Sequence, residues 1–148
     1  MSKHLALVLL YALFTPSTRS EDRLIIPSIG LAVGIGTGVY LKELETRVAL
    51  WSWTEEPGHI GNTVIGGHRT IGPGHFIDLN ELHKGDEIQV SWNGELLLYT
   101  VVRKFILTRP HQSGVIDKEA EKTDLLTLVT CHPKYHDEQR LVIRAERR

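Results

Sequence analysis

An Asn-Gly pair at positions 93 and 94 is the feature that most constrains the fold of this chain. It separates Glu87–Trp92, a run in which polar and apolar residues alternate, from Glu95–Thr108, a run with many β-branched and aromatic residues. Asn and Gly tolerate the positive φ angles of a two-residue hairpin turn, and alternation with period two is typical of a strand with one buried face. The sequence therefore predicts a β-hairpin whose second strand is long.

Most other apolar runs are also typical of strands. They are short, bounded by Gly, Pro or polar residues, and rich in β-branched side chains. The further predicted strands are Leu24–Ile26, Leu31–Ile35, Thr63–Gly66, Leu125–Thr130 and Leu141–Ile143. With the hairpin they amount to roughly seven or eight strands, which favours an all-β chain that closes, or nearly closes, into a barrel.

Little helix is predicted. Residues 40–50 favour a short helix, because apolar residues recur there at helical spacing, at Leu41, Leu44 and Val48. Phe76–Leu82 is typical of one or two helical turns. Both segments are short enough to lie within connections of the barrel.

Length and charge limit the function classes. A chain of 148 residues is expected to form one domain, and 41% apolar with 24% charged residues is ordinary for a globular protein. The 17 basic and 18 acidic residues give a net charge of −1. This balance lacks the basic excess that indicates binding to nucleic acid or to an anionic membrane surface.

The N-terminus bears on the compartment. Ten apolar residues, Leu5–Phe14, precede a polar segment, Thr15–Glu21. A ten-residue helix rises about 15 Å, half of a hydrocarbon core of about 30 Å, so the run suits the hydrophobic part of a signal peptide better than a transmembrane helix. We expect residues 1–21 to be a signal or anchor remnant with a linker, and residues 22–148 to be the folded domain. The alternative is that the apolar run is the first core element of a cytosolic domain.

Three chemically active side chains stand at the ends of predicted strands. Cys131, the only cysteine, follows one apolar run, His68 follows another, and Arg140 begins the last. A thiol is a nucleophile, an imidazole with an ordinary pKa of about 6.5 carries protons, and a guanidinium is a fixed cation with five donors. If the strand ends meet at one face of a sheet, these groups are sufficient for acyl transfer through a thioester.

The sequence around these positions resembles the sortases, a family of cysteine transpeptidases. Thr127–Cys131 reads Thr-Leu-Val-Thr-Cys, which is similar to the family signature Thr-Leu-x-Thr-Cys. Gly67–Thr70 resembles the segment that carries the family histidine, Arg140 stands where the family arginine begins the last strand, and Ile26–Leu31 resembles the family's first strand region. The likeness covers roughly residues 22–145. The motif sequences Gly-His-Arg-Thr and Thr-Cys-His-Pro-Lys are most similar to those of class E sortases, with class D next.

The resemblance implies a closed, eight-stranded sortase-type barrel and a division of roles. Cys131 would be the nucleophile, His68 the proton carrier, and Arg140 the anchor for an oxyanion or a substrate carbonyl. A sorting signal Leu-Pro-x-Thr-Gly, or Leu-Ala-x-Thr-Gly for class E, would be cleaved between Thr and Gly. The acyl group would pass to an amine of a cell-wall precursor or of a pilin lysine. The resemblance also implies a location at the extracellular face of the cytoplasmic membrane, tethered through the N-terminus, or secretion.

Two neighbouring residues compete for these roles. His132 directly follows Cys131, but adjacent side chains of an extended strand point to opposite faces, which favours His68. Arg144 lies four residues after Arg140 and therefore on the same face of its strand. Arg140 is preferred because it matches the family position.

Two further residues are expected to contact the substrate. Thr130 precedes the cysteine and would support the site through its hydroxyl or its backbone. Trp53, together with Trp51, precedes the strand that ends at His68 and would line the substrate groove. Packing in the strand or against the barrel is the alternative for each.

No cofactor or metal is predicted. The histidines have no compact zinc spacing, and Cys131 has no second cysteine to accompany it. Arg109–Asp124 is predicted to be a long polar loop, and some sortases bind calcium through acidic loop residues. The acids of this loop, for which a solvated face is the simpler interpretation, are Asp117, Glu119, Glu121 and Asp124.

Other enzyme classes fit less well. Papain-like proteases have the cysteine before the histidine, and the order is reversed here. The Ser-x-Gly-Cys spelling of L,D-transpeptidases, the phosphate loop and the Gly-x-Ser-x-Gly elbow are all absent from the sequence. A non-catalytic barrel that binds peptides is the alternative from a different class, and the intact Cys131, His68 and Arg140 argue against it.

Overall fold

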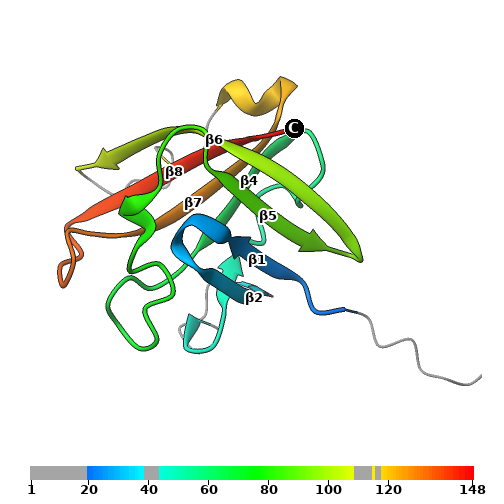
Figure 1. The fold of residues 1–148 in the computed structure, drawn as a ribbon. Helices are drawn as coiled ribbons and strands as arrows, with labels where there is room; N and C mark the ends of the chain where they lie inside the picture. The colour runs from blue at the N-terminus through cyan, green and yellow to red at the C-terminus, as the bar shows by residue number, and fades with distance from the viewer. Residues whose placement is uncertain (1–19, 39–43, 109–114, 116–117) are drawn as a thin grey trace, which may run out of the picture.

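In the computed structural model, which describes residues 20–38, 44–108, 115 and 118–148, the chain forms a closed β-barrel (Figure 1). The strands follow the order β1-β2-β3-β4-β7-β8-β6-β5 around it. Their bounds are β1 Arg23–Ile26, β2 Leu31–Thr37, β3 Val48–Leu50, β4 Gly61–Gly66, β5 Glu87–Trp92, β6 Glu95–Leu107, β7 Asp124–His132 and β8 Gln139–Arg147. The described connections contain three 3₁₀ helices: η1 Pro27–Ile29, η2 Leu79–Glu81 and η3 Lys118–Lys122. The prediction of an all-β barrel with short helices in its connections is confirmed.

The Asn-Gly turn joins β5 and β6 as predicted. Asn93 and Gly94 have φ values of 50° and 82°, so both lie in the left-handed region that this turn requires. β6 is 13 residues long and pairs with β5 through its first half and with β8 through the rest. One long strand therefore joins two parts of the barrel.

The predicted helix over residues 40–50 is wrong at its C-terminal end. Val48–Leu50 is strand β3, and all three of its residues are buried. β3 pairs in parallel with β2 at Ile35↔Val48 and antiparallel with β4 at Leu50↔Ile65. Pairing on both sides outweighs the local helical spacing, because propensity is a weak preference that tertiary contacts override. Positions 39–43 lie outside the described residues.

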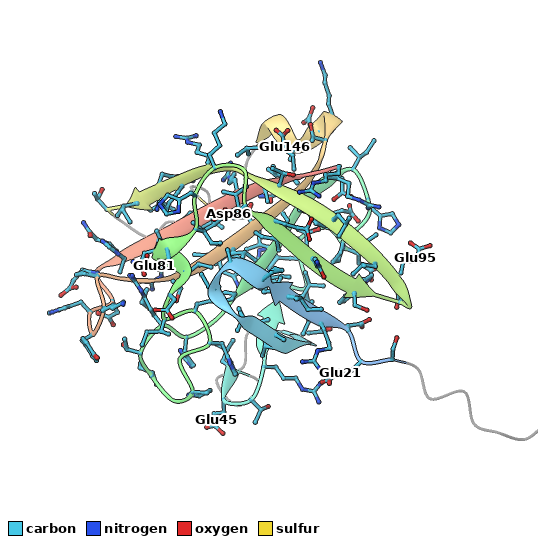
Figure 2. All side chains as sticks on the ribbon, viewed as in Figure 1. Glu21, Glu45, Glu81, Asp86, Glu95 and Glu146 are labelled. Atoms are coloured by element: carbon cyan, nitrogen blue, oxygen red, sulfur yellow. The ribbon has the colours of Figure 1, made fainter. Side chains whose placement is uncertain are left out.

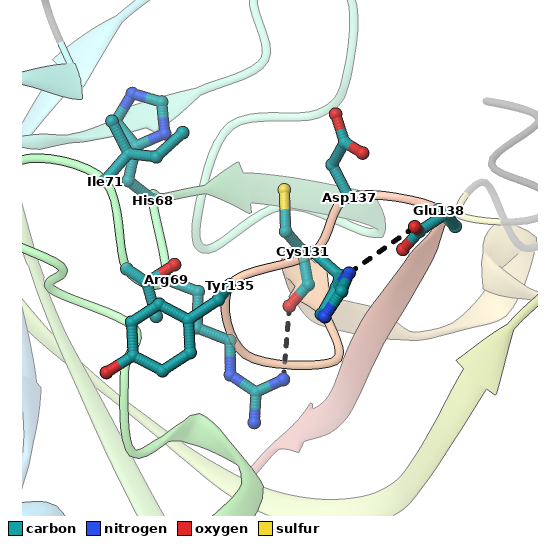
Figure 3. A pocket seen from close by; sticks show the side chains of 9 residues that line it. His68, Arg69, Ile71, Cys131, Tyr135, Asp137 and Glu138 are labelled. Atoms are coloured by element: carbon teal, nitrogen blue, oxygen red, sulfur yellow. Dashed lines mark hydrogen bonds and ion pairs between the residues drawn. The ribbon is translucent and has the colours of Figure 1, made fainter.

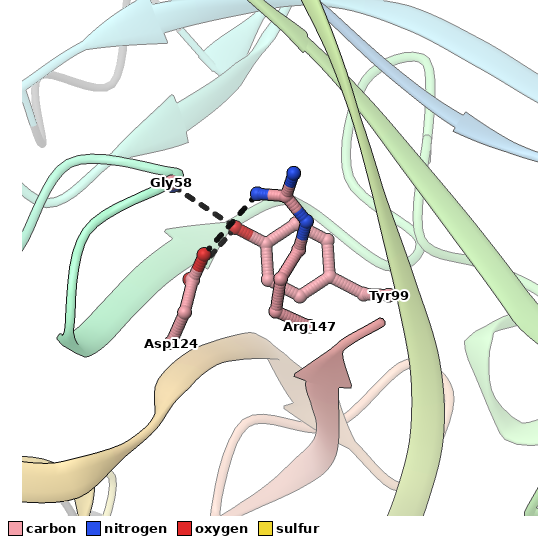
Figure 4. A network of polar contacts seen from close by, with 4 residues as sticks. All are labelled: Gly58, Tyr99, Asp124 and Arg147. Atoms are coloured by element: carbon pink, nitrogen blue, oxygen red, sulfur yellow. Dashed lines mark hydrogen bonds and ion pairs between the residues drawn. The ribbon is translucent and has the colours of Figure 1, made fainter.

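Inside the barrel, one buried tyrosine connects three segments (Figure 4). The hydroxyl of Tyr99 donates to Asp124 Oδ1 at 2.9 Å and accepts from the backbone N–H of Gly58 at 3.1 Å. Arg147 Nη1 lies 3.4 Å from Asp124 Oδ2. Burial, followed by the bond to Asp124, raises the pKa of Tyr99 well above its usual range, so the phenol remains a donor at working pH. This end of the barrel is therefore fixed by a satisfied polar network.

Most charged side chains of the described residues are exposed, with Arg69 and Arg144 buried, and apolar side chains fill the barrel. Glu21, Glu45 and Glu95 project from its periphery in Figure 2. The largest completely buried side chains include Tyr99 and Phe76. Among the described residues, no helix has the length and apolar content needed to cross a membrane.

Of the segment 109–124 that was predicted as a long loop, the structure describes residue 115 and residues 118–124. The helix η3 and the first residue of β7 lie in this part. Val115 is buried and packs against Val64, Val129 and Val142. The segment therefore contributes to the core beside β4, β7 and β8.

Candidate active site

β4 and β7 run side by side in parallel, and this pairing places His68 beside Cys131. The ladder extends from Gly61↔Asp124 to Gly66↔Val129. Two residues beyond its last pair, the chain reaches His68 on one strand and Cys131 on the other. Positions two residues apart on a strand share a face of the sheet. The strand register thus brings together two groups that are far apart in the sequence.

The end of β4 is fixed against β7 by further hydrogen bonds. The N–H of Gly67 donates to the carbonyl of Val129 at 3.2 Å, and Thr130 Oγ1 donates to the carbonyl of Gly67 at 2.7 Å. A Cβ at position 67 would lie 2.8 Å from Cδ2 of Phe76, so only glycine fits there. Thr130 therefore holds the residue that precedes His68.

Arg140 stands directly opposite Cys131. The antiparallel pair of β7 and β8 has Cys131↔Arg140 in register, so both side chains belong to one face of the sheet. Arg140 Nη1 donates to the carbonyls of Asp137 at 2.6 Å and Gln139 at 2.9 Å. These two carbonyls therefore hold the guanidinium, and Arg140 lines a cavity together with Cys131.

Two cavities meet at His68 and Cys131, which line both of them. The first, called the acidic cavity because Asp137 and Glu138 line it, has a volume of about 270 Å³ and is shown in Figure 3. In that view Sγ of Cys131 points to the same side of the strand end as the side chains of His68 and Asp137. The other residues of the acidic cavity are Arg69, Thr70, Ile71, Tyr135, His136 and Glu138.

The second, apolar cavity has a volume of about 190 Å³. It lies over β3, β4 and β7, and among the described residues that line it Arg140 is the one with a fixed charge. Besides His68, Cys131 and Arg140 it is lined by Leu44, Ala49, Trp51, Gly66, Gly67, Val129 and Thr130. A group bound in one cavity can therefore reach the same thiol as a group bound in the other.

Arg69 is a residue of the site that the sequence interpretation missed. Its side chain is only 4% exposed, and its Nη1 donates to the carbonyl of Cys131 at 3.2 Å. Burial lowers the pKa of Arg69, and the charges of Cys131 and Asp78 act in the opposite direction. The available signal was an arginine directly after the predicted proton carrier, His68.

His132 points away from the reacting groups, as expected for the neighbour of Cys131 on a strand. Its Nδ1 lies 2.8 Å from Nη1 of Arg69, and it lines neither of the two cavities. Burial and then the charge of Arg69 lower the pKa of His132. Protonation of this imidazole is therefore disfavoured.

The other predicted residues, Trp53 and Arg144, do not line the two cavities at Cys131. Trp53 is 48% exposed and lines neither cavity. Trp51 lines the apolar cavity, and the centroids of the two indole rings are 5.2 Å apart. Arg144 pairs with Thr127, and its Nη2 donates to the carbonyl of Val115 at 2.9 Å. Thus Arg140, and not Arg144, lies at Cys131, while a substrate role for Trp53 stays a prediction.

Among the described residues, no group of three or more His, Cys, Asp or Glu side chains is arranged to hold a metal ion. Of the four acids considered for calcium, Asp117 lies outside the described residues. Asp124 is engaged by Tyr99 and Arg147. The described part of the loop therefore offers no ready ligand cluster.

Residues 24–148 match the model of the sortase domain. The chain belongs to the sortase family. Sortase D of Bacillus subtilis (strain 168) is 30% identical over 124 residues, which are 82% of this chain and 60% of that protein. The chain therefore spans about 60% of the length of this curated relative.

Solved sortase structures share the fold. Sortase C-1 from Actinomyces oris superposes with a TM-score of 0.80 at 28% identity, over 95% of this chain and 81% of that one. Sortase C of Clostridium perfringens with the C-terminal cell wall sorting motif has a TM-score of 0.77 at 25% identity, over 85% and 69% of the two chains. The eight-stranded sortase barrel that the resemblance implied is confirmed.

Replacing Arg140 by lysine should lower peptide turnover about 10²–10³-fold, the usual loss for one directed oxyanion donor. Lysine keeps the charge but lacks the planar guanidinium, whose several N–H donors can bond the loop carbonyls and a developing oxyanion at the same time. Turnover of a sorting-signal peptide measures the effect, and Arg103→Lys on the exposed part of β6 is the matched control. Retention of more than about half of the wild-type rate, against that expectation, would remove the anchor role from Arg140.

Proposed function

We propose that this sortase cleaves a sorting-signal peptide between Thr and Gly through a thioester on Cys131 and transfers the acyl group to an amine. One observation carries the proposal. The thiol of Cys131 and the imidazole of His68 stand where an apolar cavity and an acidic cavity meet, and Arg140, opposite Cys131, lines the apolar cavity. A peptide-binding module without chemistry would have no need of this combination at such a junction.

Each residue has one task in the proposed reaction. Sγ of Cys131 attacks the carbonyl carbon of Thr, and Arg140 donates to the oxyanion that forms. His68 takes the proton of the Cys131 thiol and gives it to the departing amine of Gly, which leaves a thioester between Cys131 and the Thr carbonyl. The acceptor amine then loses a proton to His68 and attacks the thioester, and Cys131 is released as the new amide forms.

The apolar cavity suits the sorting signal. Leu44, Ala49 and Val129 offer apolar contacts to the leucine and to the second residue of the signal. Trp51 covers the same region, and Arg140 stands where the Thr carbonyl must lie. Clostridium perfringens sortase C, which has this fold, was solved with its C-terminal cell wall sorting motif, and that supports a peptide signal as the substrate.

The acidic cavity suits the acceptor amine. Asp137 and Glu138 lie in its wall beside Cys131, and their carboxylates favour a cationic amine near the thioester. Glu138 Oε1 lies 3.5 Å from Nδ1 of the exposed His136, so Asp137 is the better candidate for direct contact. The acceptor is proposed to be an amine of a cell-wall precursor or of a pilin lysine.

The sub-class determines the second position of the signal. The spellings in the sequence favour class E, with class D next, while the curated relative at 30% identity is a sortase D. We therefore propose that the signal has either Ala or Pro at its second position. Parallel incubation with Leu-Ala-x-Thr-Gly and Leu-Pro-x-Thr-Gly peptides decides between them.

Location follows from the family and from the N-terminus. Sortases are typically anchored in the membrane with the catalytic domain outside the cell. Residues 1–19, which contain the apolar run Leu5–Phe14, lie outside the described residues. We propose that residues 1–21 serve as the signal or tether and that the domain from residue 22 onward faces the exterior.

Transfer, rather than simple hydrolysis, is tested by adding an amine. Hydroxylamine or a glycine peptide should divert the acyl-enzyme to a hydroxamate or an amide, and this fraction should rise with amine concentration. Mass spectrometry identifies the products, and it detects the thioester on Cys131 as well. Free acid alone at every amine concentration would identify a hydrolase, and no turnover with a bound peptide would favour the non-catalytic module.

The acceptor site has its own test. Asp137→Asn should raise the concentration of amine needed for half-maximal transfer, because the site loses a charge that attracts the amine. Hydrolysis without amine should change little, since the backbone carbonyl that holds Arg140 is kept. Glu95→Gln on the exposed hairpin is the matched control. Equal amine dependence in both variants would remove Asp137 from the acceptor site.

A further inference from the structure

We propose that Arg69 is the positioning residue of this active site: its buried guanidinium fixes the backbone carbonyl of Cys131 and the imidazole of His132, and keeps a positive charge on the side of the backbone opposite to the thiol. This inference rests on the proposed function, in which Cys131 is the nucleophile. Figure 3 shows the guanidinium across the Cys131 backbone from Sγ, with a hydrogen bond to the Cys131 carbonyl. Arg69 thus contacts the nucleophilic residue through its backbone carbonyl, on the side opposite to Sγ.

The side chain of Arg69 bonds to two other parts of the chain, and one of these is bonded in turn to a third. Nη1 donates to the Cys131 carbonyl at 3.2 Å and to Nδ1 of His132 at 2.8 Å, and Nη2 donates to Asn80 Oδ1 at 3.1 Å. The Asn80 carbonyl in turn accepts from Lys104 Nζ on β6 at 2.7 Å. Charge-assisted bonds of this kind are stronger than neutral ones. The end of β7 is therefore tied to η2 and β6 through one side chain.

The hydrogen-bond partners of Arg69 are all neutral. They are a backbone carbonyl, an imidazole and an amide, none of which is anionic. A buried cation with neutral partners interacts strongly with any negative charge nearby, because the surroundings screen little. Burial is the main influence on the pKa of Arg69 and lowers it, while the charges of Cys131 and then Asp78 raise it.

The contact with His132 assigns the protonation state of that imidazole. Arginine has five N–H donors and no acceptor, so Nδ1 of His132 must accept the bond and cannot carry a proton. His132 is therefore neutral with its proton on Nε2. Arg69 thus prevents the histidine next to Cys131 from becoming a second cation beside it, and proton transfer is left to His68.

Arg69→Met is the variant that tests the proposal, because methionine keeps an apolar stem and loses every donor and the charge. Alkylation of Cys131 by iodoacetamide at pH 7, which needs no peptide substrate, should slow several-fold. kcat for peptide cleavage should fall about 10–100-fold, in line with the cost of a small misplacement of a catalytic group, with a smaller change in KM. The ¹⁵N shifts of His132 should lose the pattern of an unprotonated Nδ1.

Arg69→Lys distinguishes the effect of the positive charge from the effect of the hydrogen bonds that the guanidinium makes. Lysine should restore most of the alkylation rate but little of kcat, since one ammonium cannot hold Cys131, His132 and Asn80 together. Arg23→Met on the exposed side of β1 is the matched control. If Arg69→Met does not fold, Asn80→Ala takes its place, and the loss of one of the three bonds should lower kcat in the same direction.

The proposal is overturned if a folded Arg69→Met protein keeps its alkylation rate and kcat within about two-fold of wild type, well short of the expected loss. It is also overturned if the His132 shifts are unchanged, because the contact would then not exist in solution. Failure of the proposed function gives a different result: Cys131→Ala would keep cleaving the peptide, whatever happens at Arg69.

Discussion

Cys131→Ala should abolish peptide cleavage and leave the barrel intact. Without the thiol no thioester forms, and in hydrolases with a covalent mechanism the loss of the nucleophile costs up to about 10⁶-fold in kcat. Cys131 is the only cysteine, so no other thiol can take over. Its side chain is half-buried and points into a cavity, so truncation should disturb little packing.

Cleavage of the preferred pentapeptide and far-ultraviolet circular dichroism are measured on the same sample. The Cys131→Ala protein should also still bind the peptide, because the apolar cavity keeps all its other residues. Cys131→Ser is the matched control, since it keeps the size of the side chain and should be almost as inactive. A folded Cys131→Ala protein with wild-type turnover would falsify the thiol mechanism.

The strands could be predicted from sequence because their signals are local. Asn93-Gly94 fixes the turn between β5 and β6 by its φ angles alone. Apolar runs bounded by breakers indicate most of the other strands. β3 was missed because three buried residues, Val48–Leu50, have no periodicity of their own. Only pairing with β2 and β4 makes them a strand.

The site could be predicted only in part, because its geometry depends on register. The sequence indicates that Cys131 and His68 end two strands, but not that these strands are parallel neighbours with Gly66 opposite Val129. The contacts of Arg69 could not be predicted, although its place directly after His68 was visible in the sequence. Its partners, the Cys131 carbonyl and His132, come from a strand far away in sequence, and no local pattern indicates such contacts.

Which histidine transfers the proton also depends on this geometry. His68 lines both cavities with Cys131, whereas the ring of His132 is turned away and bonded to Arg69. A proton carrier must reach both the departing and the incoming amine, and these must approach the thioester from the cavities. The two histidines therefore differ in access to the reaction, although His132 is the nearer one in sequence.

Replacing His68 by alanine should lower kcat about 10²–10⁴-fold, the usual contribution of a positioned general acid and base. His132→Ala should cost much less, because the bond between Arg69 and the Cys131 carbonyl stays in place. The two variants are compared in turnover with and without an added amine, with circular dichroism as the check on folding. An inactive His132→Ala protein beside an active His68→Ala protein would reverse the assignment. Equal losses would mean that the imidazole held by Arg69 takes part in the chemistry.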